Sequence, residues 1–206
     1  MTIGGVTFER KLTLLIIFTT IVPMVDYYNL ATTGTKAYDR LILYFILPML
    51  LIRFALREAP RDYGWRWGDW RAGLAWTAVG CAGMALILWA VARLPAMEAY
   101  YSIRAPENVG RLLFINAVDL FGWEFIWRGL LLFGFARAFG PGPAIFLHAV
   151  PFAFMHLGKP PLETFSTIFG GAALGFVAWK TRSFVYPWLI HWFMTSFTML
   201  IASGRF

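Results

Sequence analysis

The sequence is poor in cysteine, and it lacks several motifs that mark known hydrolase sites. Cys81 is the only cysteine, so no intrachain disulfide can form and the redox compartment stays open. No His-Glu-x-x-His pair is present for a zinc site, and no Gly-x-Ser-x-Gly element for a serine nucleophile. A pair of deep aspartates is also missing, because Asp26 falls near the end of an apolar run and only Asp119 lies deep in one. These absences exclude three catalytic designs.

Apolar and aromatic side chains dominate the composition. Hydrophobic residues make up 59% of the 206-residue chain and aromatic residues 18%, which is typical of an all-α integral membrane protein with aromatic belts at both interfaces. The length permits one helical bundle, so we expect a single domain over residues 1–206. The net charge is +7, because 18 lysines and arginines face 11 acidic residues. In a membrane protein this charge indicates topology and contact with the lipid bilayer, and we expect no nucleic-acid partner.

Seven apolar runs predict a polytopic membrane bundle of about seven transmembrane helices. The runs cover residues 12–30, 39–56, 72–94, 110–138, 143–158, 162–180 and 184–203. Several are shorter than the roughly 20 residues that a span needs, so six or eight helices also fit. The first run is not followed by a small-residue cleavage site, so we expect it to remain as a span rather than to be removed as a signal peptide.

Basic residues flank these runs unequally. The side of the N-terminus carries Arg10, Lys11, Arg53, Arg57, Arg61, Arg66, Arg71, Arg137, Lys180 and Arg182. The other side carries fewer, namely Lys36, Arg40, Arg93, Arg104, Arg111, Lys159 and Arg205. Because lysine and arginine accumulate in cytoplasmic loops, the N-terminus is predicted to be cytoplasmic.

The fourth run contains ionisable residues that an apolar segment rarely carries. Asp119, Glu124 and Arg128 all lie within it, and each costs at least about 2.5 kcal/mol at the bilayer centre on insertion scales. On a helix, Glu124 and Arg128 lie one turn apart on one face, where they can pair. Asp119 lies about 140° around the helix from Glu124, with Asn116 between them. One interpretation is an ion pair that only fixes helix packing. We favour a functional site, because other polar residues suited to catalysis lie in neighbouring runs.

All three histidines of the chain fall inside predicted spans. His148, Phe152 and His156 follow each other at intervals of four residues and form one helical stripe. His191 lies in the last run, and Thr195 follows it one turn later. A lone histidine on an apolar face is usually a packing residue, and we interpret His148 in this way because it lies near the start of its helix. The other two, together with an unexplained glutamate, indicate a catalytic site.

Three motifs follow each other in a fixed order along the chain. They are Glu124-x-x-x-Arg128-Gly129, Phe152-x-x-x-His156 and Thr181-Arg-Ser-x-x-x-Pro187-x-x-x-His191. Together they resemble the CAAX protease and bacteriocin-processing family (CPBP, or Abi) of glutamic intramembrane proteases, and the likeness covers about residues 60–200. The resemblance implies an intramembrane endopeptidase, with a peptide or protein substrate that enters from the membrane. It also implies a location in the inner (cytoplasmic) membrane of a prokaryote.

The resemblance assigns roles to individual residues. Glu124 would lie in the family's Glu-Glu-x-x-x-Arg element, where Arg128 would orient it. His156 would act with the glutamate to activate water, and His191 with Thr195 would donate hydrogen bonds to the oxyanion. No metal or other cofactor is implied, although a cluster of one glutamate and two histidines makes zinc a minor possibility.

The sequence departs from the family pattern at two positions. Trp123 stands where the family has its first glutamate, which is commonly assigned as the general base, and Thr195 stands where asparagine is usual. A threonine hydroxyl can still donate a hydrogen bond. For the base we favour Glu124, with Asp119 as the fallback because it lies one turn before Trp123 on nearly the same face.

Two other functions stay open. The first is a catalytically inactive relative that acts as a membrane immunity or partner-binding protein, and the loss of the first glutamate is its best argument. The second is a proton-coupled transporter, which ranks last because the sequence shows no inverted repeat. The substrate and the oligomeric state are not determined by the sequence.

Overall fold

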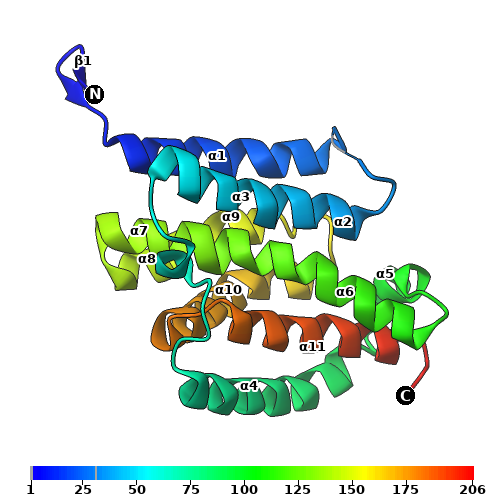
Figure 1. Cartoon of the computed structure of the whole chain (residues 1–206). Coiled ribbons are helices and arrows are strands. Elements are labelled where there is room, and N and C mark those ends of the chain that lie inside the picture. The colour runs from blue at the N-terminus through cyan, green and yellow to red at the C-terminus, as the bar shows by residue number, and fades with distance from the viewer. Residues whose placement is uncertain (1, 31) are drawn as a thin grey trace.

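The computed structural model describes residues 2–30 and 32–206, and it is a bundle of helices (Figure 1). A short antiparallel hairpin precedes the bundle, formed by β1 (Thr2–Ile3) and β2 (Val6–Thr7). The rest of the described secondary structure is helical. The all-α class predicted from the composition is therefore confirmed.

Each of the seven apolar runs is helical along most of its length. They form, in chain order, α1 (Arg10–Tyr27); α2 (Lys36–Leu41), η1 (Ile42–Ile46), α3 (Leu47–Leu50) and η2 (Leu51–Leu56); α4 (Trp70–Val91); α6 (Val109–Glu124), η5 (Phe125–Leu131) and α7 (Leu132–Phe139); α8 (Pro141–Leu147) and α9 (Ala149–Phe154); α10 (Pro161–Thr181); and α11 (Val185–Ala202). The connections carry η3 (Pro60–Tyr63), α5 (Pro95–Tyr101) and η4 (Ser102–Arg104). The segments η1, η2 and η5 are π-helical, whereas η3 and η4 are 3₁₀ turns.

Within the described residues, three helices are long and apolar enough to cross a membrane on their own: α4, α10 and α11. The pair α8–α9 is shorter, because its helical pattern is interrupted at His148. Its 14 residues would extend about 21 Å, less than the roughly 30 Å of a hydrocarbon core. The count of seven spans therefore stays a prediction.

Helix α6 lies in the middle of the bundle. Figure 1 shows it between α2–α3 on one side and α11 on the other, with α4 beyond α11 and with α8, α9 and α10 behind it, and α6 contacts both α2 and α11. The largest apolar core surrounds its continuation, η5, in which all seven residues are buried. The fourth apolar run therefore forms the interior of the protein, and its charged residues lie in that interior.

The turn between the fourth and fifth runs follows from glycine and proline chemistry. Helix α7 ends at Phe139, and Gly140 adopts a φ of +79°, which lies outside the range that other residues adopt readily. Pro141 then starts α8, where the missing N–H of a first-turn proline costs nothing. This turn returns the chain on itself, so that α8 packs against α7, and Phe152 of the histidine stripe contacts Trp127 and Arg128 of η5.

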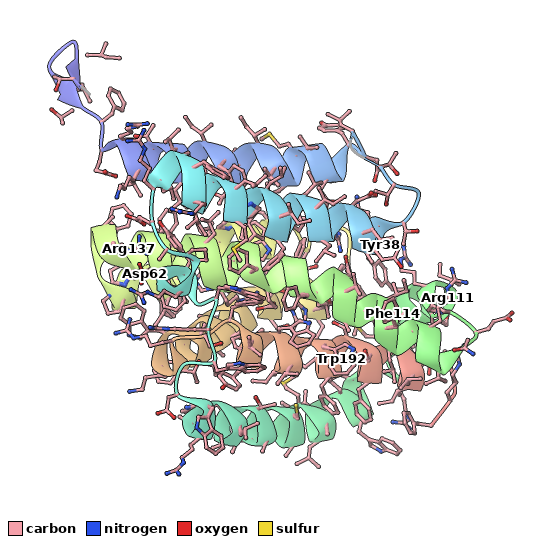
Figure 2. The ribbon with its side chains drawn as sticks, in the orientation of Figure 1. Tyr38, Asp62, Arg111, Phe114, Arg137 and Trp192 are labelled. Atoms are coloured by element: carbon pink, nitrogen blue, oxygen red, sulfur yellow. The ribbon has the colours of Figure 1, made fainter. Side chains whose placement is uncertain are left out.

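A cluster of charged side chains lies at the end of the bundle that carries the N-terminus. Glu58 accepts hydrogen bonds from Lys11 Nζ, at 2.5 Å, from Tyr63 and from Arg137. Arg137 also donates to the carbonyl of Asp62 at 3.1 Å, and Figure 2 shows these two residues side by side at this end of the bundle. Burial raises the pKa of Glu58, but the hydrogen bonds from Lys11, Tyr63 and Arg137 outweigh it, so that the pKa lies below its ordinary value. The cluster joins α1, the connection between η2 and α4, and α7.

Candidate active site

Glu124 is the last residue of α6, and its side chain is completely buried. Its Oε1 atom accepts a hydrogen bond from Nη1 of Arg128 at 2.7 Å, which confirms the predicted pairing one turn apart. The same oxygen lies 2.6 Å from Nδ1 of His191, which comes from α11. A carboxylate oxygen accepts, so Nδ1 of His191 is the donor. Three elements therefore meet at one carboxylate.

The other oxygen of this carboxylate differs in its hydrogen bonding. Oε2 of Glu124 is buried and finds no hydrogen-bond partner in the described part of the chain. An unpaired buried polar atom costs about 1–3 kcal/mol, and native proteins keep few of them without a reason. Oε2 is therefore the atom of this glutamate whose hydrogen-bonding capacity is not used by the described residues.

Arg128 is completely buried in η5 and is restrained from several directions. Its Cζ atom lies 3.8 Å from the centroid of the Phe152 ring, and Nη2 donates to the carbonyl of Gly171 at 3.5 Å. A Cβ at Gly171 would lie 3.0 Å from the Phe152 ring, so a glycine lets α10 come close to this stack. A desolvated cation over an aromatic ring gains up to about 2 kcal/mol. These contacts hold Nη1 in place against Glu124.

His156 lies just after α9, and it is buried beside two aromatic rings. Its Nδ1 atom lies 2.8 Å from the carbonyl oxygen of Phe152, and because a carbonyl only accepts, Nδ1 carries the proton and Nε2 carries the lone pair. Its ring centroid lies 4.6 Å from that of Phe152 and 6.0 Å from that of Trp123. Among the described residues, His156 makes no hydrogen bond to Glu124. The structure thus joins His191, but not His156, directly to the glutamate.

Comparison with known proteins adds the family. Residues 105–197 match the family model described as "Type II CAAX prenyl endopeptidase Rce1-like". This stretch of the chain is Rce1-like. The resemblance to the CPBP family is confirmed over these residues, which contain Glu124, His156 and His191. No curated protein and no solved structure matches the chain. Together with the apolar helices, the match supports an integral membrane protein in which residues 105–197 are similar to a CAAX-type protease family.

Trp123 directly precedes Glu124, and its indole is buried. It packs edge-on against Tyr44, with ring centroids 5.5 Å apart, and against His156 at 6.0 Å. The Arg40 guanidinium lies 4.7 Å from its ring centroid. The side chain that packs against His156 is therefore an indole, whereas the carboxylate of the next residue, Glu124, contacts His191.

The remaining predicted residues lie at different distances from this centre. Asp119 pairs with Arg40 of α2 at 2.9 Å, and among the described residues its carboxylate makes no hydrogen bond to His191. Thr195 is half-buried on α11, and its hydroxyl makes no hydrogen bond with the residues that the structure describes. Asn116 donates to Ser196 at 3.1 Å and links α6 to α11. The supporting roles assigned to Asp119 and Thr195 stay predictions.

His148 lies between α8 and α9 and is completely buried. Its Nδ1 atom donates to the carbonyl of Ala144 at 3.0 Å, and its ring fills the space over Gly175, where a Cβ would lie 2.2 Å from Cε1. This contact agrees with the packing interpretation of His148. It also explains why the small face of α10 is needed, since a larger residue at Gly175 would overlap the imidazole.

The zinc possibility gains no support from the arrangement of side chains. Over residues 2–30 and 32–206, no group of three or more His, Cys, Asp or Glu side chains is arranged to hold a metal ion. Glu124 and His191 contact each other, but a structural or catalytic zinc needs at least three such ligands. The absence of a cofactor remains a prediction.

Two features of the site have no signal in the sequence. The helix changes from α to π immediately after Glu124, so a wheel drawn at 100° per residue fails over η5. In addition, the sequence places Arg40 among the flanking charges and gives no sign that it contacts Asp119 and Trp123. Both features depend on contacts between segments far apart in the chain.

Proposed function

We propose that this protein is an intramembrane endopeptidase in which Glu124 and His156 hold and activate a water molecule. The observation that carries the proposal is the buried Glu124 carboxylate, which Arg128 and His191 fix through Oε1 while Oε2 stays free. A carboxylate inside an apolar bundle is costly, and two charge-stabilised contacts on one of its oxygens orient the other. The Rce1-like match supplies the reaction class, peptide hydrolysis.

The proposed reaction uses each of these groups once. Oε2 of Glu124 orients a water molecule, and the lone pair on Nε2 of His156 accepts one of its protons. The hydroxide attacks the peptide carbonyl carbon, and His191, in its protonated form, donates a hydrogen bond to the oxyanion together with Thr195. When the C–N bond breaks, His156 returns the proton to the leaving amine. The products are a carboxylic acid, which loses its proton to water, and an amine, and the proposed reaction uses no metal.

The substrate is proposed to be a peptide that reaches the site from the membrane. Prenylated or other lipid-linked C-terminal segments, bacteriocin leaders and C-terminal sorting tails all meet this description. The matched family description names a CAAX prenyl endopeptidase, which favours the first of these. A prenyl chain would hold such a peptide at the bilayer, because each buried CH₂ contributes about 0.8 kcal/mol.

The direct test is cleavage of a prenylated, fluorogenic CAAX peptide by the purified protein in nanodiscs. We expect Glu124→Gln and His156→Ala to abolish cleavage, since the first removes the charge that orients water and the second removes the base. Glu107→Gln is the matched control, because this glutamate is exposed on the turn before α6. Full cleavage by both site variants would overturn the proposal.

A second candidate is a catalytically inactive relative that serves as a membrane immunity or partner-binding protein. Trp123 favours it, because the group that faces His156 is an indole that cannot accept a proton. The variant Trp123→Glu separates the two candidates. If the native protein is inactive and this variant cleaves the peptide, then the native chain is the inactive relative. If the native protein cleaves and the variant adds little, then Glu124 suffices.

We also propose that the N-terminus lies in the cytoplasm, with the protein in a prokaryotic inner membrane. The larger group of basic residues, which includes Lys11 and Arg137, supports this orientation. A Cys81→Ser background with a new cysteine at Thr2 provides the test. An impermeant maleimide applied to intact spheroplasts should leave that cysteine unlabelled, and labelling would reverse the orientation.

A further inference from the structure

Arg40, at the end of α2, contacts α6 through three different interactions. Its Nη1 group donates to both carboxylate oxygens of Asp119, at 3.2 and 2.9 Å. Its guanidinium lies 4.7 Å from the ring centroid of Trp123. Its backbone carbonyl lies so close to Gly122 that a Cβ there would be 2.5 Å from the oxygen. One residue therefore contacts three consecutive points of one helix face, because positions 119, 122 and 123 are spaced as i, i+3 and i+4.

Arg40 is itself held by α1. Its Nε atom donates to Oδ2 of Asp26 at 3.2 Å, and the same oxygen accepts from the Tyr44 hydroxyl at 2.8 Å. Lys36 Nζ lies 2.8 Å from the other oxygen of Asp26. Asp26 is buried, so removal of its partners would leave an uncompensated charge in an apolar environment. The network restrains the guanidinium, and with it the face of α6 that the guanidinium contacts.

This restraint lies directly before the candidate active site. Gly122 and Trp123 precede Glu124, and the π-helical segment begins at the next residue. A rotation of α6 about its axis would turn the carboxylate away from His191 and change which side chain faces His156. The regular α geometry ends at this point, so the helix beyond Glu124 does not fix the rotation by itself.

We propose that Arg40 is a positioning residue that fixes the rotation of α6 and thereby the contact between Glu124 and His191. Arg40 lies outside the matched residues 105–197, so the N-terminal helices supply this function to the Rce1-like part of the chain. These helices would hold Glu124 in the orientation that the proposed reaction needs, in a site where Trp123 replaces the family's first glutamate. Any effect on the cleavage rate rests on the proposed function, whereas the contact with His191 can be measured without it.

Histidine NMR measures this contact directly, because the chain has only three histidines. Protein labelled with ¹⁵N-histidine in nanodiscs gives signals that His148→Gln, His156→Gln and His191→Gln assign. Glu124→Gln then gives the position of the His191 signal without its carboxylate. We expect Arg40→Ala to move the His191 Nδ1 signal most of the way to that position, while the His148 signal stays in place.

Arg111→Ala is the matched control, because Arg111 is an exposed arginine in the first turn of α6, whereas Glu124 is the last residue of that helix. Figure 2 shows Arg111 at the end of the bundle where α6 begins. This variant should leave the His191 signal unchanged. If Arg40→Ala does not fold, Gly122→Ala perturbs the same contact from the α6 side, and the same shift is expected. A native His191 signal in whichever of these variants folds would overturn the proposal.

Cleavage assays on the same variants separate this proposal from the proposed function. A displacement of about 1 Å at a reacting group costs on the order of 100-fold in rate, so Arg40→Ala should lower kcat by that order with KM little changed. If the native protein cleaves no peptide but Arg40→Ala still shifts the His191 signal, the proposed function fails and the positioning role stands. If the native protein cleaves and neither kcat nor the signal changes in Arg40→Ala, the positioning role fails alone.

Discussion

Arg128 and Lys159 form two ion pairs that differ strongly in burial, with the acid before the cation in the first pair and after it in the second. Arg128–Glu124 and Lys159–Glu163 are both spaced i, i+4, and the N–O distance is 2.7 Å in each. Both side chains of the first pair are completely buried, whereas those of the second are 27% and 21% exposed. The pairs therefore allow the contribution of burial to be measured with spacing and distance held constant.

The perturbation is replacement of each cation by methionine, which keeps an apolar stem of similar length. Arg128→Met leaves a buried carboxylate without its main counter-charge, and breaking a buried pair in this way costs about 3–5 kcal/mol. It also removes the stack on Phe152, which adds up to about 2 kcal/mol. Lys159→Met breaks a partly exposed pair between the connection before α10 and the first turn of α10, for which about 0.2–1 kcal/mol is expected. We therefore expect the first variant to lose several times more stability than the second.

The assay is reversible unfolding in mixed micelles, followed by circular dichroism as the fraction of denaturing detergent rises. The double variant Arg128→Met/Glu124→Gln completes a thermodynamic cycle, because removing both charges leaves neither one unpaired. It should be more stable than Arg128→Met alone. Equal losses for Arg128→Met and Lys159→Met, or a double variant that is no more stable than the single one, would refute the buried ion pair at the candidate site.

Three further predictions follow from other parts of the structure. Gly175→Ala should lower the free energy of unfolding by about 1–3 kcal/mol, because the new Cβ would lie 2.2 Å from the His148 ring. Gly170→Ala is the control: position 170 has open space around it, so the same assay should show a free energy of unfolding raised by up to about 1 kcal/mol. The hydrogen bonds of Glu58 stabilise the fold above the ordinary glutamate pKa of about 4.3, and this stabilisation is lost as the pH falls through the lowered folded-state pKa. The difference in unfolding free energy between the native protein and Glu58→Gln should therefore be constant from about pH 6 to 8 and should shrink in acid. A difference that grows in acid would contradict the assignment. Peptide cleavage should persist after dialysis against EDTA and 1,10-phenanthroline, and a loss that zinc restores would show a metal enzyme.

Local sequence patterns predict much of the fold. The apolar runs predict where helices lie because a backbone in lipid must satisfy its own hydrogen bonds, and helices do so within one segment. The turn at Gly140 follows because the next residue is a proline that can only begin a helix. The breaks inside the runs were not predictable in this way. The interruption at His148 and the π-helical segment after Glu124 arise where packing against other helices changes the local geometry.

The contacts of the candidate site also fall into those that the sequence predicts and those that it does not. The sequence alone predicts that Glu124 and Arg128 can pair, because a spacing of four residues brings them to one face of a helix, and the structure shows the pair. Only the tertiary structure decides that His191 contacts the Glu124 carboxylate, that His156 packs against Trp123, and that Arg40 pairs with Asp119. Such contacts depend on how each helix is rotated against its neighbours, and this rotation is set by packing over the whole bundle rather than by the spacing of residues within one segment.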